Sequence, residues 1–242
     1  MLLSSISSGE ARSRFITHAA QQKRADGVII VDLRVSPEEV AALARSEVAA
    51  VTVGSRHAPY PSVTVDHAPA AGLAVEHLVG LGHRRIGLIS GAPGGPLEFT
   101  APLQRRNAYH QTLERAGLDH GPELEGTGNF TVDGGREAMA GLLSGRDRPT
   151  AVFAMSDEMA YGAMGAIRDV GLGVPDDISV VGFDDHELAE VFELTTVRQH
   201  AEQHGAIAAR LLLDHLDRGA VDHVKVPTEL VVRSSTSPPS EG

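Results

Sequence analysis

The stretch Pro175-Asp-Asp-Ile-Ser-Val-Val-Gly-Phe-Asp184-Asp185 decides the fold that we expect for this chain. Between Pro175 and the two aspartates, residues 178–183 form a mostly apolar, partly β-branched run. Such a run predicts a strand that is buried on both faces of a parallel sheet. Because the strand ends in a pair of carboxylates, it places charge at the carboxyl edge of the sheet, where ligands bind in open α/β folds.

A second stretch, Thr150-Ala-Val-Phe-Ala-Met-Ser156-Asp157, follows the same pattern of an apolar strand that ends in polar groups. Two strands that bring polar side chains to one edge predict a ligand cleft. For Asp157 we keep a second interpretation open, because an aspartate at the start of a helix is also a common N-cap.

Outward from these two stretches, strands and helices alternate along the chain. This alternation predicts an α/β fold, with parallel sheets covered by helices on both faces. The Gly/Pro-rich loop at 90–96 lacks the spacing of a phosphate-binding loop, so we predict a turn or hinge there. The polar tail at 234–242 is predicted to be frayed. Strands are predicted at 1–6, 26–32, 49–53, 62–65, 86–90, 151–155, 178–183 and 224–232, the last interrupted by Pro227, and helices at 10–23, 37–44, 70–81, 103–116, 133–143, 158–170 and 200–218.

Length and composition limit the possible classes. A chain of 242 residues allows one large domain or two lobes. It contains no cysteine and no apolar run as long as a membrane helix, and its N-terminus is a poor signal peptide. We therefore expect a cytoplasmic protein without a membrane partner, a cofactor or a metal site. With 32 acidic and 21 basic residues, the formal net charge is -11, so this chain alone should bind DNA poorly.

Several short motifs follow one another along the chain. They are Val65-Asp66, Glu76-His-Leu-Val-Gly-Leu-Gly-His-Arg-Arg-Ile-Gly87, Ser156-Asp157-Glu-Met-Ala-Tyr-Gly162, Val174-Pro-Asp-Asp-Ile-Ser-Val-Val-Gly-Phe-Asp-Asp185, Leu194-Thr-Thr-Val-Arg-Gln199 and Pro227-Thr-Glu-Leu-Val-Val-Arg-Ser-Ser-Thr236. In addition, Arg105 precedes Tyr109 and Leu113 along the chain. In their order and spacing, these residues resemble the effector-binding core of the lactose-repressor (LacI/GalR) family of transcriptional regulators.

The resemblance implies two Rossmann-like lobes of the type I periplasmic-binding-protein kind. One lobe would comprise 1–65 and 199–227, and the other 66–198 and 228–242. The chain opens at what resembles the second strand of the first lobe, so the family's first strand and helix of that lobe are missing here. This departure would leave a gap in the sheet or force another pairing of the strands. The helix-turn-helix of the family is missing as well.

The resemblance also implies which residues contact the effector. Arg105 and Asp184 match the family's arginine and carboxylate, and Ser156 stands where some sugar-binding members have Asn. Phe130 occupies the position of an aromatic that packs on the ligand ring, with a plain core Phe as the alternative. Asp157 and Asp185 are expected behind these contacts, as caps or loop ties.

Three functional classes compete for this chain. The favoured one is the sensing core of a regulator, which binds a small molecule such as a sugar, forms a homodimer and contacts DNA only through the missing helix-turn-helix. A solute-binding protein for sugar uptake shares the fold. An enzyme would use Asp157, Asp184 and Asp185, but no nucleophile–base pair accompanies them, so we assign no catalytic residue.

Overall fold

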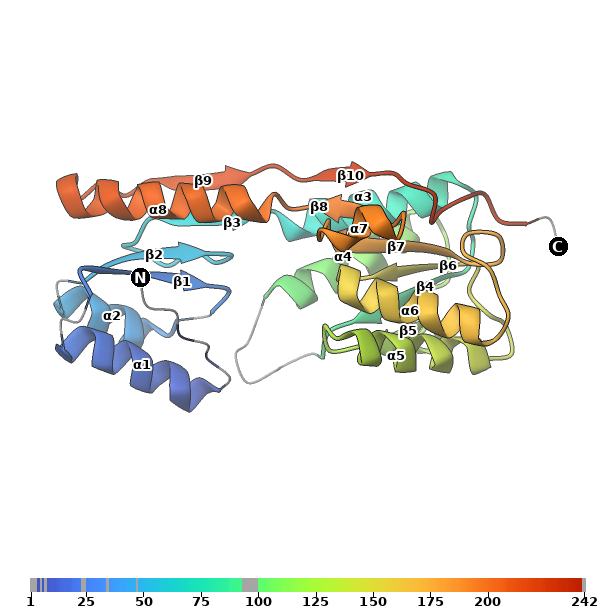
Figure 1. The fold of residues 1–242 in the computed structure, drawn as a ribbon, viewed down its shortest axis with the longest axis horizontal. Coiled ribbons are helices and arrows are strands. Elements are labelled where there is room, and N and C mark those ends of the chain that lie inside the picture. Colours follow the sequence, from blue (N-terminus) through green and yellow to red (C-terminus); the bar gives the residue numbers. More distant parts are fainter. Residues whose placement is uncertain are drawn as a thin grey trace. The chain divides into compact units, whose positions relative to one another are not determined.

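The computed structural model describes residues 4, 6, 8–22, 25–33, 35–46, 48–92 and 100–240, with the backbone alone for 17–22. Strands and helices alternate along them (Figure 1). The predicted strand at 1–6 and the loop at 90–96 lie mostly outside the described residues. The helices are α1 (Gly9–Gln22), α2 (Pro37–Arg45), α3 (His67–Gly80), α4 (Ala101–Arg115), α5 (Val132–Ser144), α6 (Asp157–Asp169), α7 (Leu188–Val191) and α8 (Ala201–Arg218), with one short 3-10 turn, η1 (Pro122–Leu124). The strands are β1 (Gly27–Val31), β2 (Ala49–Val53), β3 (Ser62–Val65), β4 (Ile86–Ser90), β5 (Glu125–Thr127), β6 (Ala151–Ala154), β7 (Ser179–Asp184), β8 (Thr195–Arg198), β9 (His223–Val226) and β10 (Glu229–Val231).

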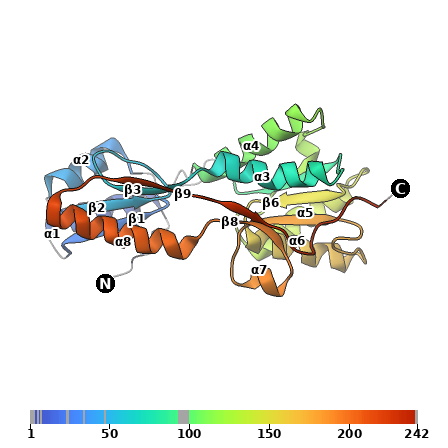
Figure 2. The ribbon, with the colours of Figure 1, turned by 90° about the horizontal axis from the view of Figure 1, so that it is seen from above.

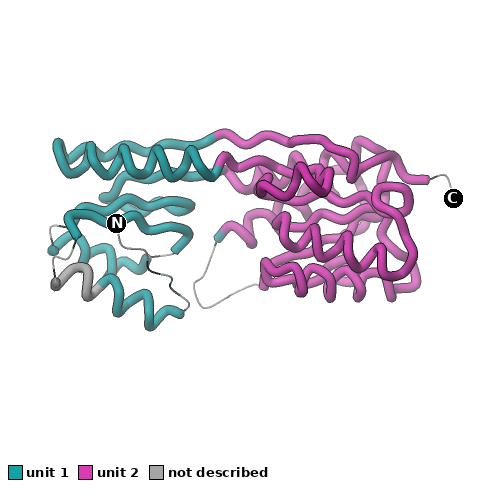
Figure 3. The backbone as a smooth tube through the Cα atoms, in the orientation of Figure 1, with its two compact units in different colours: residues 1–65, 94–100, 201–226 teal, residues 66–93, 101–200, 227–242 magenta. Residues whose placement is uncertain are grey.

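The chain divides into two compact units, each assembled from separate segments (Figure 3). Unit 1 consists of Met1–Val65, Gly94–Thr100 and Ala201–Val226. Unit 2 consists of Asp66–Pro93, Ala101–His200 and Pro227–Gly242. Each unit has a sheet of its own, so each is described by itself below.

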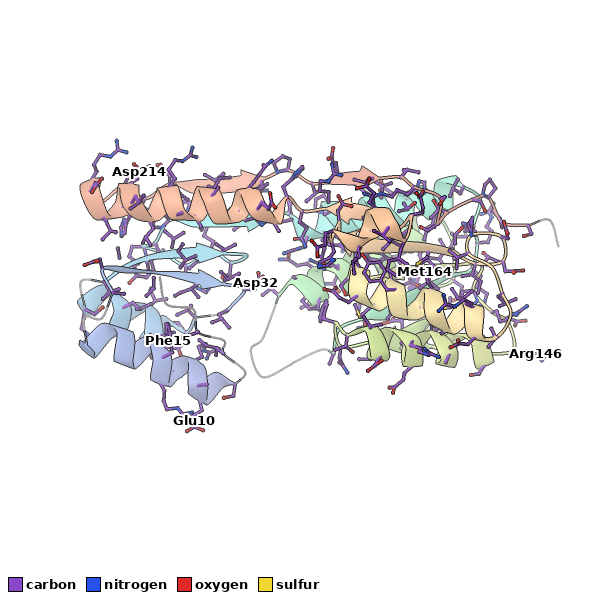
Figure 4. All side chains as sticks on the ribbon, viewed as in Figure 1. Glu10, Phe15, Asp32, Arg146, Met164 and Asp214 are labelled. Carbon is purple, nitrogen blue, oxygen red and sulfur yellow. The ribbon has the colours of Figure 1, made fainter. Side chains whose placement is uncertain are left out.

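Unit 1 is a parallel sheet in the order β1-β2-β3-β9, with α1 and α2 on one face and α8 on the other (Figure 1). Side chains alternate between the faces of a strand. Ala50 of β2 therefore packs in the core with Ile16 and Leu43, while Val51 packs with Leu211 on the α8 face. Phe15, labelled in Figure 4, lies partly buried against the core of the first face.

Helix α2 begins where the sequence predicts it, because Ser36 and Glu39 form a capping box. The Ser36 hydroxyl accepts from the Glu39 backbone N–H at 3.2 Å, and the Glu39 carboxylate accepts from the Ser36 N–H at 2.8 Å. Pro37, at the first position of the helix, lacks the N–H that would otherwise have no partner there.

The sequence left open whether the first lobe has a gap or a changed strand pairing. In the structure β1 pairs directly with β2 in parallel, with Ile29 opposite Val51 and Val31 opposite Val53. The changed pairing is therefore the outcome among the described residues. β1 is an edge strand of this sheet, and its Val31 side chain is 55% exposed.

Unit 2 has a larger sheet in the order β10-β8-β7-β6-β4-β5, in which only β10 runs antiparallel. Helices α3 and α4 lie together on one face, and α5 and α6 lie on the other (Figure 2). The central strands β4, β6 and β7 are buried on both faces, as their apolar runs predict. Their side chains and those of α3 to α6 form one continuous core. Met164, predicted as part of an inward stripe on α6, packs against this core (Figure 4).

The terminal strand predicted at 224–232 is interrupted at Pro227 as expected, but its two parts are separate strands rather than one. The segment forms two strands, β9 in the sheet of unit 1 and β10 in the sheet of unit 2, on either side of Pro227. Proline has no backbone N–H to donate to a ladder, so it falls between the strands.

The prediction of a frayed tail is wrong for the residues that follow β10. The Ser235 hydroxyl donates to the Val180 carbonyl at 2.6 Å, and the Thr195 N–H donates to the same hydroxyl at 2.8 Å. The carbonyl of Ser237 lies 2.9 Å from Nε2 of the buried His83. These contacts hold residues 235–237 along the sheet of unit 2.

Candidate functional site

The carboxyl edge of the unit 2 sheet gathers most of the side chains that the sequence singled out. The five parallel strands β8, β7, β6, β4 and β5 all end at this edge. Asp184 is the last residue of β7, and Ser156 follows β6 by two residues. Arg105 reaches the edge from α4. The structure therefore brings Arg105 and Asp184 together, as predicted from their positions in the chain.

Arg105 is held from several sides. Its side chain is 7% exposed, and its Nη1 donates to the Met155 carbonyl at 2.5 Å. The guanidinium lies over the ring of Phe183, with Cζ 3.6 Å from the ring centroid, which is a cation–π arrangement. The orientation of this arginine is therefore set by the protein.

Asp184 stays partly open, with a side chain that is 34% exposed. Its Oδ1 lies 4.0 Å from Arg105 Nη2, and it accepts a hydrogen bond from the side-chain amide of Gln199. Burial raises the pKa of Asp184 to about 7, helped by the nearby carboxylates of Asp157 and Glu158 and opposed by Arg105 and Gln199. Asp184 can accordingly accept hydrogen bonds as a carboxylate or donate one as an acid near neutral pH.

Two further residues of this cluster were not predicted from the sequence. His67, in the first turn of α3, places Nδ1 3.4 Å from Arg105 Nη2, and its ring centroid is 6.3 Å from that of Phe183. Gln199 follows β8 and contacts Asp184. The signal for both was their place directly after a predicted strand or a family motif, at Asp66 and at Arg198. Histidine and glutamine are residue types that do not by themselves indicate a binding site.

Asp157 is fully buried behind this cluster, and the interpretation of its side chain as an N-cap is wrong. The cap of α6 is Ser156, whose hydroxyl accepts from the Met159 N–H at 3.3 Å. Asp157 instead accepts from the Thr196 hydroxyl at 2.5 Å and from the His186 N–H at 2.7 Å. It thus ties β8 and the segment after β7 to the start of α6. Burial raises the pKa of Asp157, against the effect of these two hydrogen bonds.

Asp185 has the opposite environment to its neighbour Asp184. It accepts from Arg198 Nε at 2.5 Å and from Arg233 Nη2 at 2.8 Å. Burial alone would raise the pKa of Asp185, but the hydrogen bonds from the two arginines outweigh it and hold the pKa below its usual value. Asp185, which follows β7, therefore links that strand to β8 through Arg198 and to the tail through Arg233.

Phe130 lies at the same edge, in the segment between β5 and α5. Its ring packs over Gly91, at the end of β4, where a Cβ would lie 2.1 Å from the ring. The ring is 37% exposed, so the alternative of a plain core Phe is not what the structure shows. β4 and β7 are separated by β6, which places their ends about 10 Å apart at the usual strand spacing.

Comparison with known proteins decides the family. A model of the family "Periplasmic binding protein-like domain" matches residues 75–236. Catabolite control protein A of Priestia megaterium is 34% identical over 220 residues, which are 88% of this chain and 65% of that protein. The solved lac repressor dimer, bound to operator and the anti-inducer ONPF, is 32% identical with a TM-score of 0.80, over 94% of this chain and 79% of that chain. This chain belongs to the LacI family.

Another solved LacI-family relative, the transcriptional regulator CelR in complex with cellobiose, is 32% identical with a TM-score of 0.81, over 94% of this chain and 71% of that chain. The relatives are transcriptional regulators rather than enzymes. The LacI-family chain described here spans 65% of the length of catabolite control protein A. Among its described residues, no helix is both long and apolar enough to cross a bilayer.

Proposed function

We propose that this chain is the ligand-sensing domain of a LacI-type transcriptional regulator and that it binds a small molecule, a sugar or a related compound. The observation that carries the proposal is the Arg105–Asp184–Gln199 cluster at the carboxyl edge of the unit 2 sheet. The polar groups of this cluster are oriented before any ligand arrives, which is typical of preformed binding sites. The cellobiose in the CelR complex supports a sugar as the class of ligand.

In this proposal Asp184 accepts hydrogen bonds from ligand hydroxyls, and Arg105 holds the carboxylate in place and offers its Nη2 edge. Phe130 covers the apolar face of the ligand ring. The hydroxyl oxygen of Ser156 accepts the hydrogen bond that caps α6, so Ser156 would contact a ligand by donating its hydroxyl hydrogen. Asp157 and Asp185 act behind the site, because their oxygens bind protein groups.

The two units would act as the two lobes of the family. Ligand binding favours whichever conformation offers it more contacts, so the signal is a population shift. The function as a DNA-binding regulator belongs to a full-length protein that carries a helix-turn-helix. The net charge of -11 supports this division, because an acidic chain has little attraction for phosphate backbones. We further propose a cytoplasmic location and no catalytic activity.

We also propose that the domain forms a homodimer through an apolar surface on unit 2, made of Tyr161, Val191 and Phe192. Val191 is 73% exposed and Phe192 is 45% exposed, and the Phe192 ring lies 4.9 Å from that of Tyr161. The dimer in the lac repressor structure supports a second copy as the occupant of this surface.

A solute-binding protein for sugar uptake is the alternative with the same fold. The relatives favour the regulator, since CelR and the lac repressor both bear the names of regulators. Under either alternative the ligand site is the same, so the site can be tested first.

The experiment is calorimetric titration with a panel of sugars and nucleosides, on the natural chain and on Asp184→Ala. Losing the Asp184 acceptor leaves ligand donors without a partner, which should weaken binding by about 1–3 kcal/mol, or roughly 5- to 150-fold. The control is Asp176→Ala, which removes an exposed carboxylate near the other end of β7. Arg105→Ala is less informative, because the enclosed guanidinium also packs on Phe183 and its loss would lower stability.

Two results would contradict the proposal. Absence of binding by any member of the panel would argue against a sugar or nucleoside sensor. Equal affinity of Asp184→Ala and the natural chain for a ligand that does bind would place the site elsewhere. Thermal melts on the same samples show whether a lost affinity reflects a lost fold.

A further inference from the structure

The arginines that lie near Asp184 and Asp185 are all engaged with protein acceptors, within the part of unit 2 that the structure describes. Arg105 binds the Met155 carbonyl and faces Asp184. Arg198 binds Asp185 and, at 2.8 Å, Glu229. Arg233 binds Asp185 and donates to the Leu194 carbonyl at 2.7 Å. The guanidinium groups that a ligand anion could approach at this edge therefore already donate hydrogen bonds to protein oxygens.

Arg105 is the arginine that a ligand at Asp184 would meet first, and it is closed on most sides. One terminal nitrogen is directed at a backbone carbonyl, the other lies between His67 and Asp184, and one face rests on Phe183. Gripping a phosphate or carboxylate needs two free parallel donors of the guanidinium fork. The geometry of Arg105 does not present such a pair to a ligand.

His67 helps to enclose Arg105. A guanidinium has only donors, so the His67 Nδ1 at 3.4 Å from Arg105 takes the role of acceptor. His67 thus engages the nitrogen of Arg105 that also faces Asp184.

Carboxylates outnumber arginines among the described side chains of this edge. Asp157, Glu158, Asp184 and Asp185 lie close enough to influence one another, against the three paired arginines. Burial raises the pKa of Asp184 most, the charge of Arg105 lowers it, and the charges of Asp157 and Glu158 raise it further. An anionic ligand group would enter the same unfavourable field, because like charges at short distance in a partly buried site repel strongly.

We propose that this site takes an uncharged, hydroxylated ligand and rejects the phosphate ester or carboxylate of the same ligand. The inference rests on the proposed function and adds the charge class of the effector. Neutral hydroxyls can donate to Asp184 and accept from Gln199, whereas an anion would face the Asp184 carboxylate beside arginines that, among the described residues of unit 2, already bind protein groups.

The test compares matched pairs by calorimetry: ribose with ribose 5-phosphate, glucose with glucose 6-phosphate and gluconate, and cytidine with cytidine monophosphate. Titrations are run about one unit above the pKa of Asp184, where its carboxylate is ionised. We expect the neutral member of the pair that binds to bind at least about tenfold more tightly than its charged counterpart. Equal or tighter binding of the charged member would overturn the inference while leaving the sensing function intact.

The variant Asp184→Asn tests whether Asp184 causes the rejection. Replacing the carboxylate by an amide of the same shape should weaken binding of the neutral ligand. It should also reduce the ratio of the two dissociation constants, charged over neutral, by about fivefold or more. The matched control, Asp176→Asn, removes one charge near the amino end of the same strand. Its ratio of dissociation constants should equal that of the natural chain. If both variants keep the ratio, Asp184 does not select against charge and the inference fails. If no member of the panel binds, the proposed function fails first.

Discussion

Asp184 and Asp185 are consecutive residues with opposite electrostatic environments. Asp184 ends β7, stays partly open beside a single enclosed arginine, and has a pKa raised to about 7. Asp185 points to two arginines that hold its pKa low. Both residues have positive φ angles, 127° and 58°, so the backbone turns sharply where the strand ends. This turn separates the two carboxylates. Asp184 lies in the candidate site beside Arg105, and Asp185 binds the two arginines that join the strands to the tail.

The raised pKa of Asp184 predicts how stability depends on pH. In the unfolded chain this carboxyl titrates near 3.8, and in the folded chain near 7. The folded state therefore binds more protons between these values, so the stabilising contribution of the protonated group is lost as the pH rises toward 7. We expect the free energy of unfolding in urea to fall across that window, with a shallower fall in Asp184→Asn. About a third of the side chain is exposed, so water moderates the effect.

The control for this pH dependence is Asp176→Asn, measured in the same urea series. Its slope should match that of the natural chain. If Asp184→Asn also keeps the natural slope, then Asp184 is not the group that titrates in this window.

At the level of residues, the sequence predicted which side chains reach the edge but not what they bind. Arg105 and Asp184 follow from motif spacing and from the end of a strand. The acceptor of Arg105 is a carbonyl 50 positions away, and the donors to Asp157 come from 39 and 29 positions away. Such contacts depend on how the strands are ordered in the sheet, which local patterns do not specify.

Among the elements, α5 and α6 pack unusually closely because glycines lie at their contact. A Cβ at Gly162 would lie 2.0 Å from the Val132 carbonyl oxygen, and one at Gly135 would lie 2.3 Å from that of Met159. Both neighbours are backbone atoms that cannot rotate away. The two helices therefore need hydrogen as the side chain at these positions.

We predict that Gly162→Ala destabilises unit 2 by about 2 kcal/mol or more, because a methyl group there forces the two helices apart. Gly165→Ala is the matched control: it lies on the same helix with nothing within 4 Å of the added Cβ. Alanine is the better helix former, so the control should be neutral or stabilising by up to about 1 kcal/mol. Urea unfolding followed by circular dichroism measures both. Equal effects of the two substitutions would show that the close contact is not needed.

Helices and long strands could be predicted because their patterns are strong. The helix that begins at Pro37 is an example, since its capping box is visible in the sequence. The short elements were missed: β5 has three residues with a glycine at its centre, and α7 has four. Elements of this length have no periodicity of their own and form because neighbouring strands and helices provide their partners.

For the molecule as a whole, the apolar surface at Tyr161, Val191 and Phe192 predicts self-association. We expect the natural chain to show a dimer mass by light scattering at high concentration and Phe192→Asp to shift the mass toward the monomer, because a buried unpaired charge at an interface is unfavourable. Val170→Asp, which changes another exposed valine of unit 2, should leave the dimer unchanged. A monomeric natural chain would contradict self-association, and a dimeric Phe192→Asp variant would place the interface elsewhere.

The interleaving of the two units has a consequence for biosynthesis. Unit 1 lacks α8 and β9 until residues 201–226 have left the ribosome, and unit 2 lacks β10 and the stretch at 235–237 until later still. The amino-terminal unit is thus completed only after residues 66–93 and 101–200 of unit 2 have been synthesised, although domains usually fold as units in the order of synthesis. A ribosome that stalls after His200 would carry two unfinished sheets, each with an unpaired edge at β3 or β8. Exposed edges of this kind are what chaperones that bind nascent chains protect.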